Sequence, residues 1–168
     1  MKKPTLRESI ILALLTALLF VAQLALSFLP NIELVSLLVI LYTLVYKRKA
    51  LWCIYIFALL QGLFYGFTSW WVSYLYIWTA LWLVTMILKE MDNALGWAIV
   101  SGAFGLCFGA LSELPFLFII GMKASFAAWV SGIPFDIAHC VGNFVLALVL
   151  YKPLVKVLRR LEKGKQNA

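Results

Sequence analysis

Six apolar runs follow one another along the chain, and short polar or turn-forming segments separate them. A helix needs about 20 apolar residues to cross a bilayer, and most of the runs approach that length. The second run is shorter, so we expect its helix to tilt or to be supported by its neighbours. The pattern predicts an all-α membrane protein, a compact bundle of about six transmembrane helices. The expected helices cover roughly residues 9–29, 32–46, 50–67, 72–88, 94–121 and 126–151.

Prolines and glycines mark breaks within this pattern. Pro115 gives the long fifth helix a place to tilt or break, and the segment Gly132-Ile133-Pro134 should interrupt the sixth. A basic segment, residues 152–168, follows the last run. It is either a cytoplasmic anchor or an amphipathic helix lying on anionic lipid.

The composition places the chain in lipid rather than in water. Of its 168 residues, 65% are hydrophobic and 12% are charged, whereas a soluble domain carries roughly 25% charged residues. We therefore expect residues 1–168 to form one integral membrane domain. The net charge of +7 comes from basic clusters between the apolar runs, so we do not expect nucleic-acid binding. The cysteines lack metal-ligand spacing, and neither a metal nor a cofactor is expected.

The basic residues also predict the orientation of the bundle. If the N-terminus is inside, thirteen of the fourteen Lys and Arg residues fall in inner segments, and only Lys123 falls outside. Positively charged loops resist translocation, so both termini are predicted to be cytoplasmic in a multi-pass protein of the cell membrane. The first run also imitates a signal peptide that ends in small residues, but its length favours a membrane span.

Four ionisable residues fall inside predicted spans, where charged groups are costly and tend to be functional. They are Glu33, Glu113, Asp136 and His139, and Asn143 shares a helical face with the last two. We expect them either to form the polar floor of an outward-facing pocket or to hold helices together through an Asp136–His139 pair. Glu33 is alternatively a carboxylate of a helix N-terminus, stabilised by the helix dipole.

Aromatic residues crowd the outer end of the predicted fourth span. Trp71, Tyr74 and Trp78 are among them, and the last two share a helix face at i, i+4 spacing. Such residues are ordinary at a membrane interface. Alternatively, they build a stacking wall for a flat ligand.

Small residues recur four positions apart in three of the predicted helices. Such faces let neighbouring helices approach closely. The pairs are Ala13 with Ala17, Gly62 with Gly66, and Gly105 with Gly109.

Catalytic signatures are missing from the sequence. It contains no HExxH, GxSxG or Walker motif. Asp136 and His139 have no evident nucleophile beside them. We therefore predict no enzymatic activity, no catalytic residues and no ATP hydrolysis by this chain.

The motifs together resemble the substrate-binding S component of energy-coupling factor (ECF) vitamin transporters. The first helix carries Ala13-Leu-Leu-Thr-Ala17, and the first outer turn reads Pro30-Asn31-Ile-Glu33-Leu. The segment Ser131-Gly-Ile-Pro-Phe-Asp-Ile-Ala-His139, followed by Gly142-Asn143-Phe144, is similar to the sixth helix of some S components. The resemblance in size, helix number and topology covers essentially the whole chain.

The resemblance implies partners, a substrate and a pocket. In this family the small-residue face of the first helix docks on a transmembrane coupling protein driven by two cytoplasmic ATPases, which implies Ala13 and Ala17 at the partner interface. The implied substrate is a vitamin or cofactor precursor, of a cobalamin or another type. The alternatives are a solitary small-solute carrier or channel without ATPase partners, and a membrane enzyme or assembly factor. The implied pocket residues are Glu33, Trp71, Tyr74, Trp78, Glu113, Asp136, His139 and Asn143.

Overall fold

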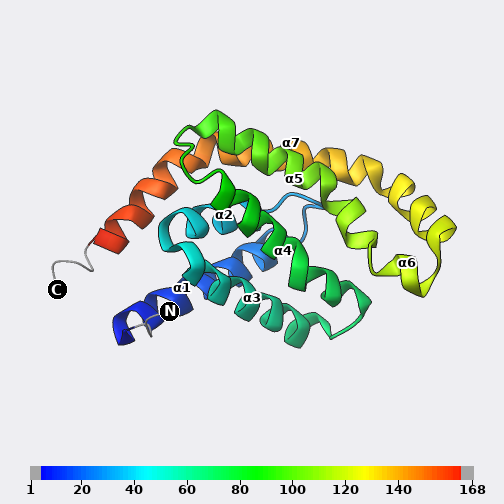
Figure 1. The fold of residues 1–168 in the computed structure, drawn as a ribbon, viewed down its shortest axis with the longest axis horizontal. Helices are drawn as coiled ribbons and strands as arrows, with labels where there is room; N and C mark the ends of the chain where they lie inside the picture. The colour runs from blue at the N-terminus through cyan, green and yellow to red at the C-terminus, as the bar shows by residue number, and fades with distance from the viewer. Residues whose placement is uncertain (1–4, 164–168) are drawn as a thin grey trace.

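The computed structural model describes residues 5–163, and within that range the chain is helical, without a β-strand. This confirms the predicted all-α fold class. Figure 1 shows α5 and α7 along one side of the molecule, α1 and α3 on the opposite side, and α2 and α4 between them. The elements are α1 (Leu6–Ala25), α2 (Val35–Tyr46), the 3-10 helix η1 (Lys47–Lys49), α3 (Ala50–Tyr65), α4 (Ser69–Ile87), α5 (Ala94–Glu113), α6 (Phe116–Ile119) and α7 (Met122–Lys163).

Four helical segments of the described chain are long and apolar enough to cross a membrane. Large apolar side chains such as Leu14, Phe118 and Val149 are exposed on the surface of the molecule. Contact with lipid stabilises such a surface, whereas water does not. The structure therefore supports a membrane protein. The four segments are Leu6–Ala25, Ser69–Ile87, Ala94–Ile119 and Met122–Glu162.

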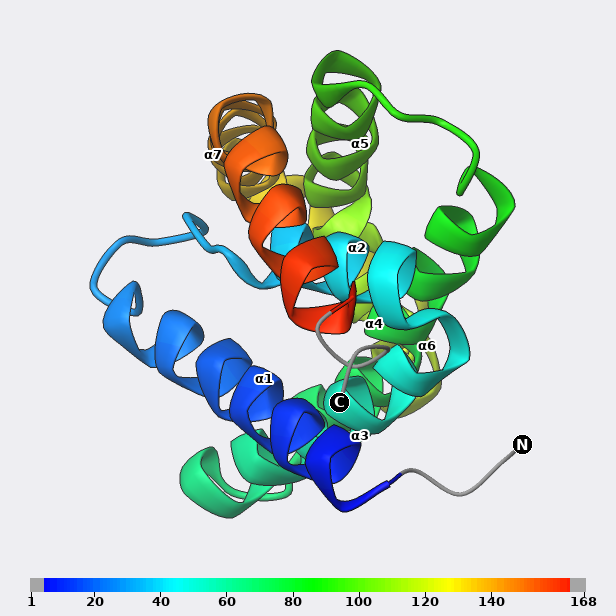
Figure 2. The same cartoon turned by 90° about the vertical axis from the view of Figure 1, so that its left-hand side faces the viewer.

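The short helix α2 forms the centre of the bundle. Every side chain from Val35 to Thr43 is buried, so this stretch has no face left for lipid or water. A helix that is apolar all round suits such a position. Its 12 residues span about 18 Å, less than the hydrocarbon thickness of a bilayer. Its neighbours α3, α4 and α7 surround it, which agrees with the support expected for a short second helix (Figure 2).

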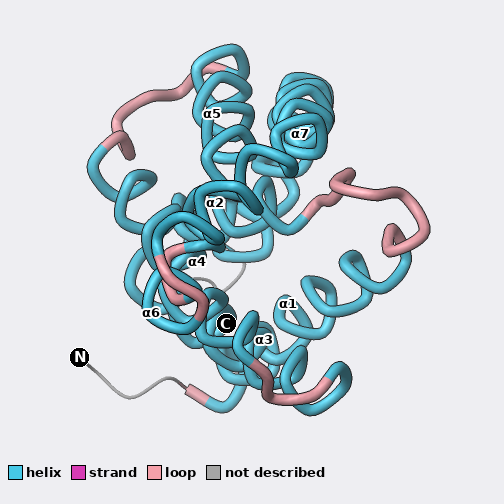
Figure 3. The backbone as a smooth tube through the Cα atoms, turned by 90° about the vertical axis from the view of Figure 1, so that its right-hand side faces the viewer, coloured by secondary structure: helices cyan, strands magenta, loops and turns pink. Residues whose placement is uncertain are grey.

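The two helices α5 and α7 lie side by side (Figure 3), and Figure 1 shows α7 running along α5. Glycines of α5 make this approach possible. A Cβ atom added at Gly105 would lie 2.9 Å from the backbone of His139, and one at Gly109 would lie 2.4 Å from the carboxylate of Asp136. At Gly105 only glycine leaves room for the backbone of α7, and at Gly109 the missing Cβ makes room for the Asp136 carboxylate, so the predicted close approach is confirmed. We call this contact the α5–α7 seam.

Helix α1 has two different faces. Leu12, Leu15 and Leu19 are buried toward the core. Ala13 and Ala17 lie on the other side and are exposed. One face of α1 is therefore held by the bundle, and its small-residue face has no cover within the described chain.

Polar contacts join the helix ends on the side of the molecule that carries the basic clusters. Lys49 Nζ lies 2.5 Å from Glu8 Oε1, which joins η1 to α1. Arg159 Nη2 lies 3.4 Å from Asp92 Oδ1, which joins α7 to the α4–α5 connection. We call this side the basic end. The connections 26–34, 66–68 and 114–121 belong to the opposite helix ends.

The helix bounds differ from the prediction around the first connection. Helix α1 ends at Ala25 and α2 begins at Val35, so Glu33 lies between helices rather than inside one. The predicted break at Pro115 is confirmed, because α5 ends at Glu113 and the short helix α6 follows this proline. A proline fits the first turn of a helix but not its interior.

The predicted interruption at residues 132–134 and the predicted helix end at residue 151 are both wrong. Helix α7 continues from Met122 to Lys163 with Pro134 and Pro153 inside it. Each proline removes one backbone hydrogen bond and bends the helix, but packing holds the helix together. Val155 and Leu158 beyond the second proline are buried in the core. Residues 152–163 therefore belong to α7, and residues 164–168 of the predicted tail lie outside the described residues.

Candidate ligand-binding site

A cavity of about 280 Å³ lies between the α1–α2 connection and helices α1, α4, α5 and α7. It is on the side opposite the basic end, because it uses the last turn of α1 and the residues that follow it. Four predicted site residues line it: Glu33, Tyr74, Trp78 and His139. We call it the Glu33 cavity. The other lining residues are Gln23, Leu26, Ser27, Leu29, Pro30, Asn31, Ile32 and Phe108.

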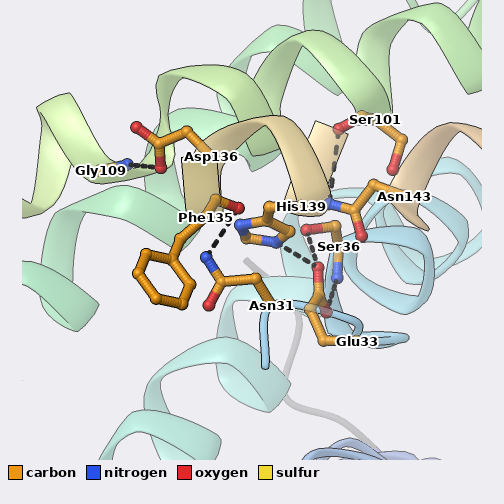
Figure 4. Close-up of polar contacts among 9 residues, drawn as sticks. All are labelled: Asn31, Glu33, Ser36, Ser101, Gly109, Phe135, Asp136, His139 and Asn143. Carbon is orange, nitrogen blue, oxygen red and sulfur yellow. Dashed lines mark hydrogen bonds and ion pairs between the residues drawn. The ribbon is translucent and has the colours of Figure 1, made fainter. Parts of the chain in front are cut away.

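The carboxylate of Glu33 has two partner residues (Figure 4). The backbone N–H of Ser36 donates to Oε2 at 2.8 Å, and the Ser36 hydroxyl donates to Oε1 at 2.5 Å. Nε2 of His139 lies 3.1 Å from the same Oε1. The carboxylate thus caps the first turn of α2, as one interpretation of the sequence expected, and it also holds the imidazole of α7.

These partners favour the ionised form of Glu33, which lies in the connection before α2. Burial by itself raises the pKa of this carboxyl, but the hydrogen bond and charge of His139 and the hydrogen bonds of Ser36 lower it below its ordinary value. Nε2–H of His139 donates to the carboxylate. Nδ1 is then an acceptor in the neutral ring and a donor in the imidazolium ring. Nδ1 has no hydrogen-bond partner among the described residues.

The α1–α2 connection is fastened to α7 beside the cavity. Asn31 Nδ2 donates to the carbonyl of Phe135 at 2.9 Å (Figure 4). Asn31 has a φ of 58°, a left-handed conformation that asparagine adopts more readily than most residues. Gly142 of α7 lies against Ile32, since a Cβ added there would be in ordinary van der Waals contact with the Ile32 side chain at 3.4 Å. Together with the Glu33–His139 pair, these contacts follow successive turns of α7.

Aromatic rings form the wall opposite this connection. The ring centroids of Tyr74 and Trp78 are 5.6 Å apart, and those of Trp78 and Phe108 are 5.7 Å apart. Phe108 lies 5.0 Å from the imidazole of His139. Nε1 of Trp78 is buried and has no hydrogen-bond partner among the described residues. The wall therefore provides aromatic surface for a ligand, while the Trp78 N–H is enclosed by protein.

Asp136 and Asn143 contact α5 rather than the cavity. The backbone N–H of Gly109 donates to Oδ1 of Asp136 at 3.0 Å, and Asn143 Nδ2 lies 3.5 Å from the carbonyl of Ser101. The Asp136–His139 pair considered from the sequence is wrong, because the hydrogen-bond partner of the imidazole is Glu33 (Figure 4). Both side chains stabilise the α5–α7 seam.

Trp71 and Glu113 also lie outside the Glu33 cavity. Trp71 Nε1 donates to the carbonyl of Ala58 at 2.7 Å and so joins α4 to α3. Glu113 ends α5 and lines a separate, mostly apolar pocket of about 160 Å³ with Phe126 and Trp129. The structure thus brings together four of the eight predicted pocket residues and separates the others.

Some residues that line the Glu33 cavity were not predicted as site residues, although the sequence distinguishes them from their neighbours. Asn31 belongs to the turn motif after the first run, and Gln23 is a polar residue within that run. Phe108 is one of many aromatic residues in apolar runs, and only the packing of α5 on α4 and α7 places it at the cavity.

Comparison with protein-family models, with curated proteins and with solved structures finds no match for this chain. Among residues 5–163, no group of three or more His, Cys, Asp or Glu side chains could hold a metal ion. The functional assignment therefore rests on the geometry of the cavity and of the exposed helix faces.

Proposed function

We propose that this protein is the substrate-binding S component of an ECF-type importer, which takes up a vitamin or cofactor precursor. The main support for this proposal is the Glu33 cavity, where a buried carboxylate–imidazole pair lies against an aromatic wall. Small-molecule sites are typically concave and mostly apolar, with a few placed polar groups that fix the orientation of the ligand. Such a site suits a protein that binds one solute and presents it to a partner.

In this proposal the basic end faces the cytoplasm and the Glu33 cavity opens to the outside. The chain crosses the membrane about six times, with both termini inside. The ion pairs Lys49–Glu8 and Arg159–Asp92 support this arrangement, since they join helix ends that should lie on the inner side.

Cysteine labelling tests this orientation. In a variant without Cys53, Cys107 and Cys140, a cysteine at the exposed position Ser27 should react with an impermeant thiol reagent on intact cells. A cysteine at the exposed position Glu90 should react only after the cells are opened. Labelling of Glu90→Cys in intact cells would reverse the orientation.

The size of the cavity favours a compact substrate. Pockets for drug-sized ligands measure about 300–1,000 Å³, and the Glu33 cavity has about 280 Å³. This volume favours a small vitamin or precursor over a cobalamin-type molecule. The aromatic wall of Tyr74, Trp78 and Phe108 favours a substrate with a planar ring.

The exposed face of α1 is the proposed docking surface for the transmembrane coupling protein. Ala13 and Ala17 are both exposed there, and their small side chains allow a partner helix to approach closely. The two cytoplasmic ATPases act through that coupling protein, which agrees with the missing Walker motif in this chain.

Identification of the bound solute tests the substrate site. Small molecules released from the protein purified from its native host are identified by mass spectrometry, and the molecule found is then used in melting experiments. Trp78→Phe and His139→Ala should each weaken its binding by roughly 5- to 150-fold, because the first reduces the aromatic wall and the second removes the imidazole that holds the Glu33 carboxylate. The control Trp52→Phe changes an exposed tryptophan and should keep the ligand-induced shift in Tm. An unchanged shift in both cavity variants would place the substrate elsewhere.

Uptake measurements distinguish the proposal from a solitary carrier. Ala13→Trp with Ala17→Trp should abolish both uptake and copurification of the ATPases, while ligand binding to the isolated chain survives. Ala103→Trp, at an exposed alanine of α5, is the matched control and should change neither. Uptake by the purified chain alone in liposomes would favour a solitary carrier instead.

A further inference from the structure

A second cavity, of about 430 Å³, lies at the basic end and plays no part in the proposed function. The start of α1, the end of α2, η1 and the end of α7 enclose it. Leu44 and Val45 provide apolar surface, and Tyr46 lies beside them. The charged side chains that line it are Lys47, Lys49, Arg159, Glu8 and Glu162.

The charged groups of this cavity are only partly paired. Lys49 is paired with Glu8, and Arg159 is paired with Asp92. Within the described chain, Lys47 and Glu162 have no ion pair. One uncommitted cation and one uncommitted carboxylate therefore line the same cavity.

Tyr46 is a buried part of the cavity lining. Its side chain is 7% exposed, and its hydroxyl has no hydrogen-bond partner among the described residues. The hydroxyl is enclosed by protein, so Tyr46 contributes ring surface to the cavity rather than a donor.

The backbone at the neighbouring Lys47 is strained. Its φ is 53°, in a region that residues other than glycine rarely adopt. Strain of this kind occurs at ligand sites, where the surrounding structure holds a side chain in place.

We propose that this cavity binds the phosphoethanolamine headgroup of a membrane phospholipid. The phosphodiester carries one negative charge, which Lys47 would bind. The primary ammonium carries one positive charge and three donors, which suit the carboxylate of Glu162. The headgroup thus matches the two uncommitted charges in number and sign. A lipid is the favoured source, since basic residues at helix ends lie at the level of the headgroups and Leu44 and Val45 extend the cavity with apolar surface.

Native mass spectrometry of the full chain tests this inference. The delipidated protein is offered an equimolar mixture of phosphatidylethanolamine, phosphatidylcholine and phosphatidylglycerol, and we expect it to retain phosphatidylethanolamine preferentially. Lys47→Gly removes the cation and relieves the backbone strain, and Glu162→Gln removes the carboxylate. Each should reduce this retention by about five-fold. A melting curve for each variant establishes that it is folded.

Two neighbouring charges at the basic end provide matched controls. Arg48→Ala and Glu90→Gln change residues that do not line this cavity, so they should keep the preference. Equal retention of the choline lipid, preference for the glycerol lipid, or equal effects of the control and cavity variants would each overturn the proposal. Displacement of the lipid by an equal concentration of free O-phosphoethanolamine would overturn the lipid as the source. None of these outcomes depends on the transported substrate.

Discussion

The α5–α7 seam and the outer face of α1 carry the same sequence pattern, two small residues four positions apart, and use it differently. At the seam, Gly105 and Gly109 bring α5 against the backbone of His139 and the carboxylate of Asp136. On α1, Ala13 and Ala17 are exposed. The pattern therefore marks a place of close approach without identifying the partner. The partner is within this chain in the first case, and we propose that it is another protein in the second.

Gly62 and Gly66 form the third pair of small residues four positions apart, and the two glycines have different roles. A Cβ at Gly62 would collide with the rings of Phe67 and Trp71, so this residue makes room for side chains that join α3 to α4. Gly66 has nothing within 4 Å of an added Cβ, and its φ of 90° ends α3. Gly66 is thus required for its backbone conformation rather than for helix packing.

The largest expected loss of stability comes from placing a large side chain in the α5–α7 seam. Gly109→Leu places a side chain where the Asp136 carboxylate lies, and overpacking of this kind should lower the free energy of unfolding by about 3 kcal/mol. Thermal unfolding of the purified protein measures it. Gly132→Ala is the control, because nothing lies within 4 Å of the added Cβ and alanine favours helix. A similar Tm for both variants would contradict the close packing at Gly109.

His139 belongs to the α5–α7 seam through its backbone and to the Glu33 cavity through its side chain, so the two contributions can be tested separately. His139→Ala keeps the backbone contact with Gly105 but removes one of the two partner residues of the buried Glu33 carboxylate. Since Ser36 still donates two hydrogen bonds, we expect a loss of about 1–2 kcal/mol in the free energy of unfolding. Chemical denaturation without ligand measures this loss. A loss as large as that of Gly109→Leu would mean that the imidazole stabilises the seam itself.

The smallest effect on stability is expected on α1. Ala13→Trp and Ala17→Trp should change the free energy of unfolding of the isolated chain by less than about 0.5 kcal/mol, because both positions are exposed. The same melting experiment measures this change. A clear drop in Tm would show that this face packs within the chain, and the proposed contrast with the seam would then be lost.

The sequence predicted the helical class and the break at Pro115 because periodicity and proline chemistry act locally. It did not predict that α7 continues through Pro134 and Pro153, since buried residues such as Val155 and Leu158 hold that helix. Asp136 and His139 were expected to act together. Residues three apart differ by about 60° around a helix, which is enough to direct one side chain to α5 and the other to Glu33.

The enclosure of α2 constrains how the protein is made. Because α2 is about 18 Å long and its walls include α7, its final surroundings do not exist until the last helix has been synthesised. A helix this short is a poor membrane anchor by itself. In the proposed topology with about six spans, the nascent chain would therefore have to retain α2 beside α1, or within the insertion machinery, until α7 arrives. A truncation before α7 should leave α2 without a stable membrane position and expose the chain to quality-control proteolysis.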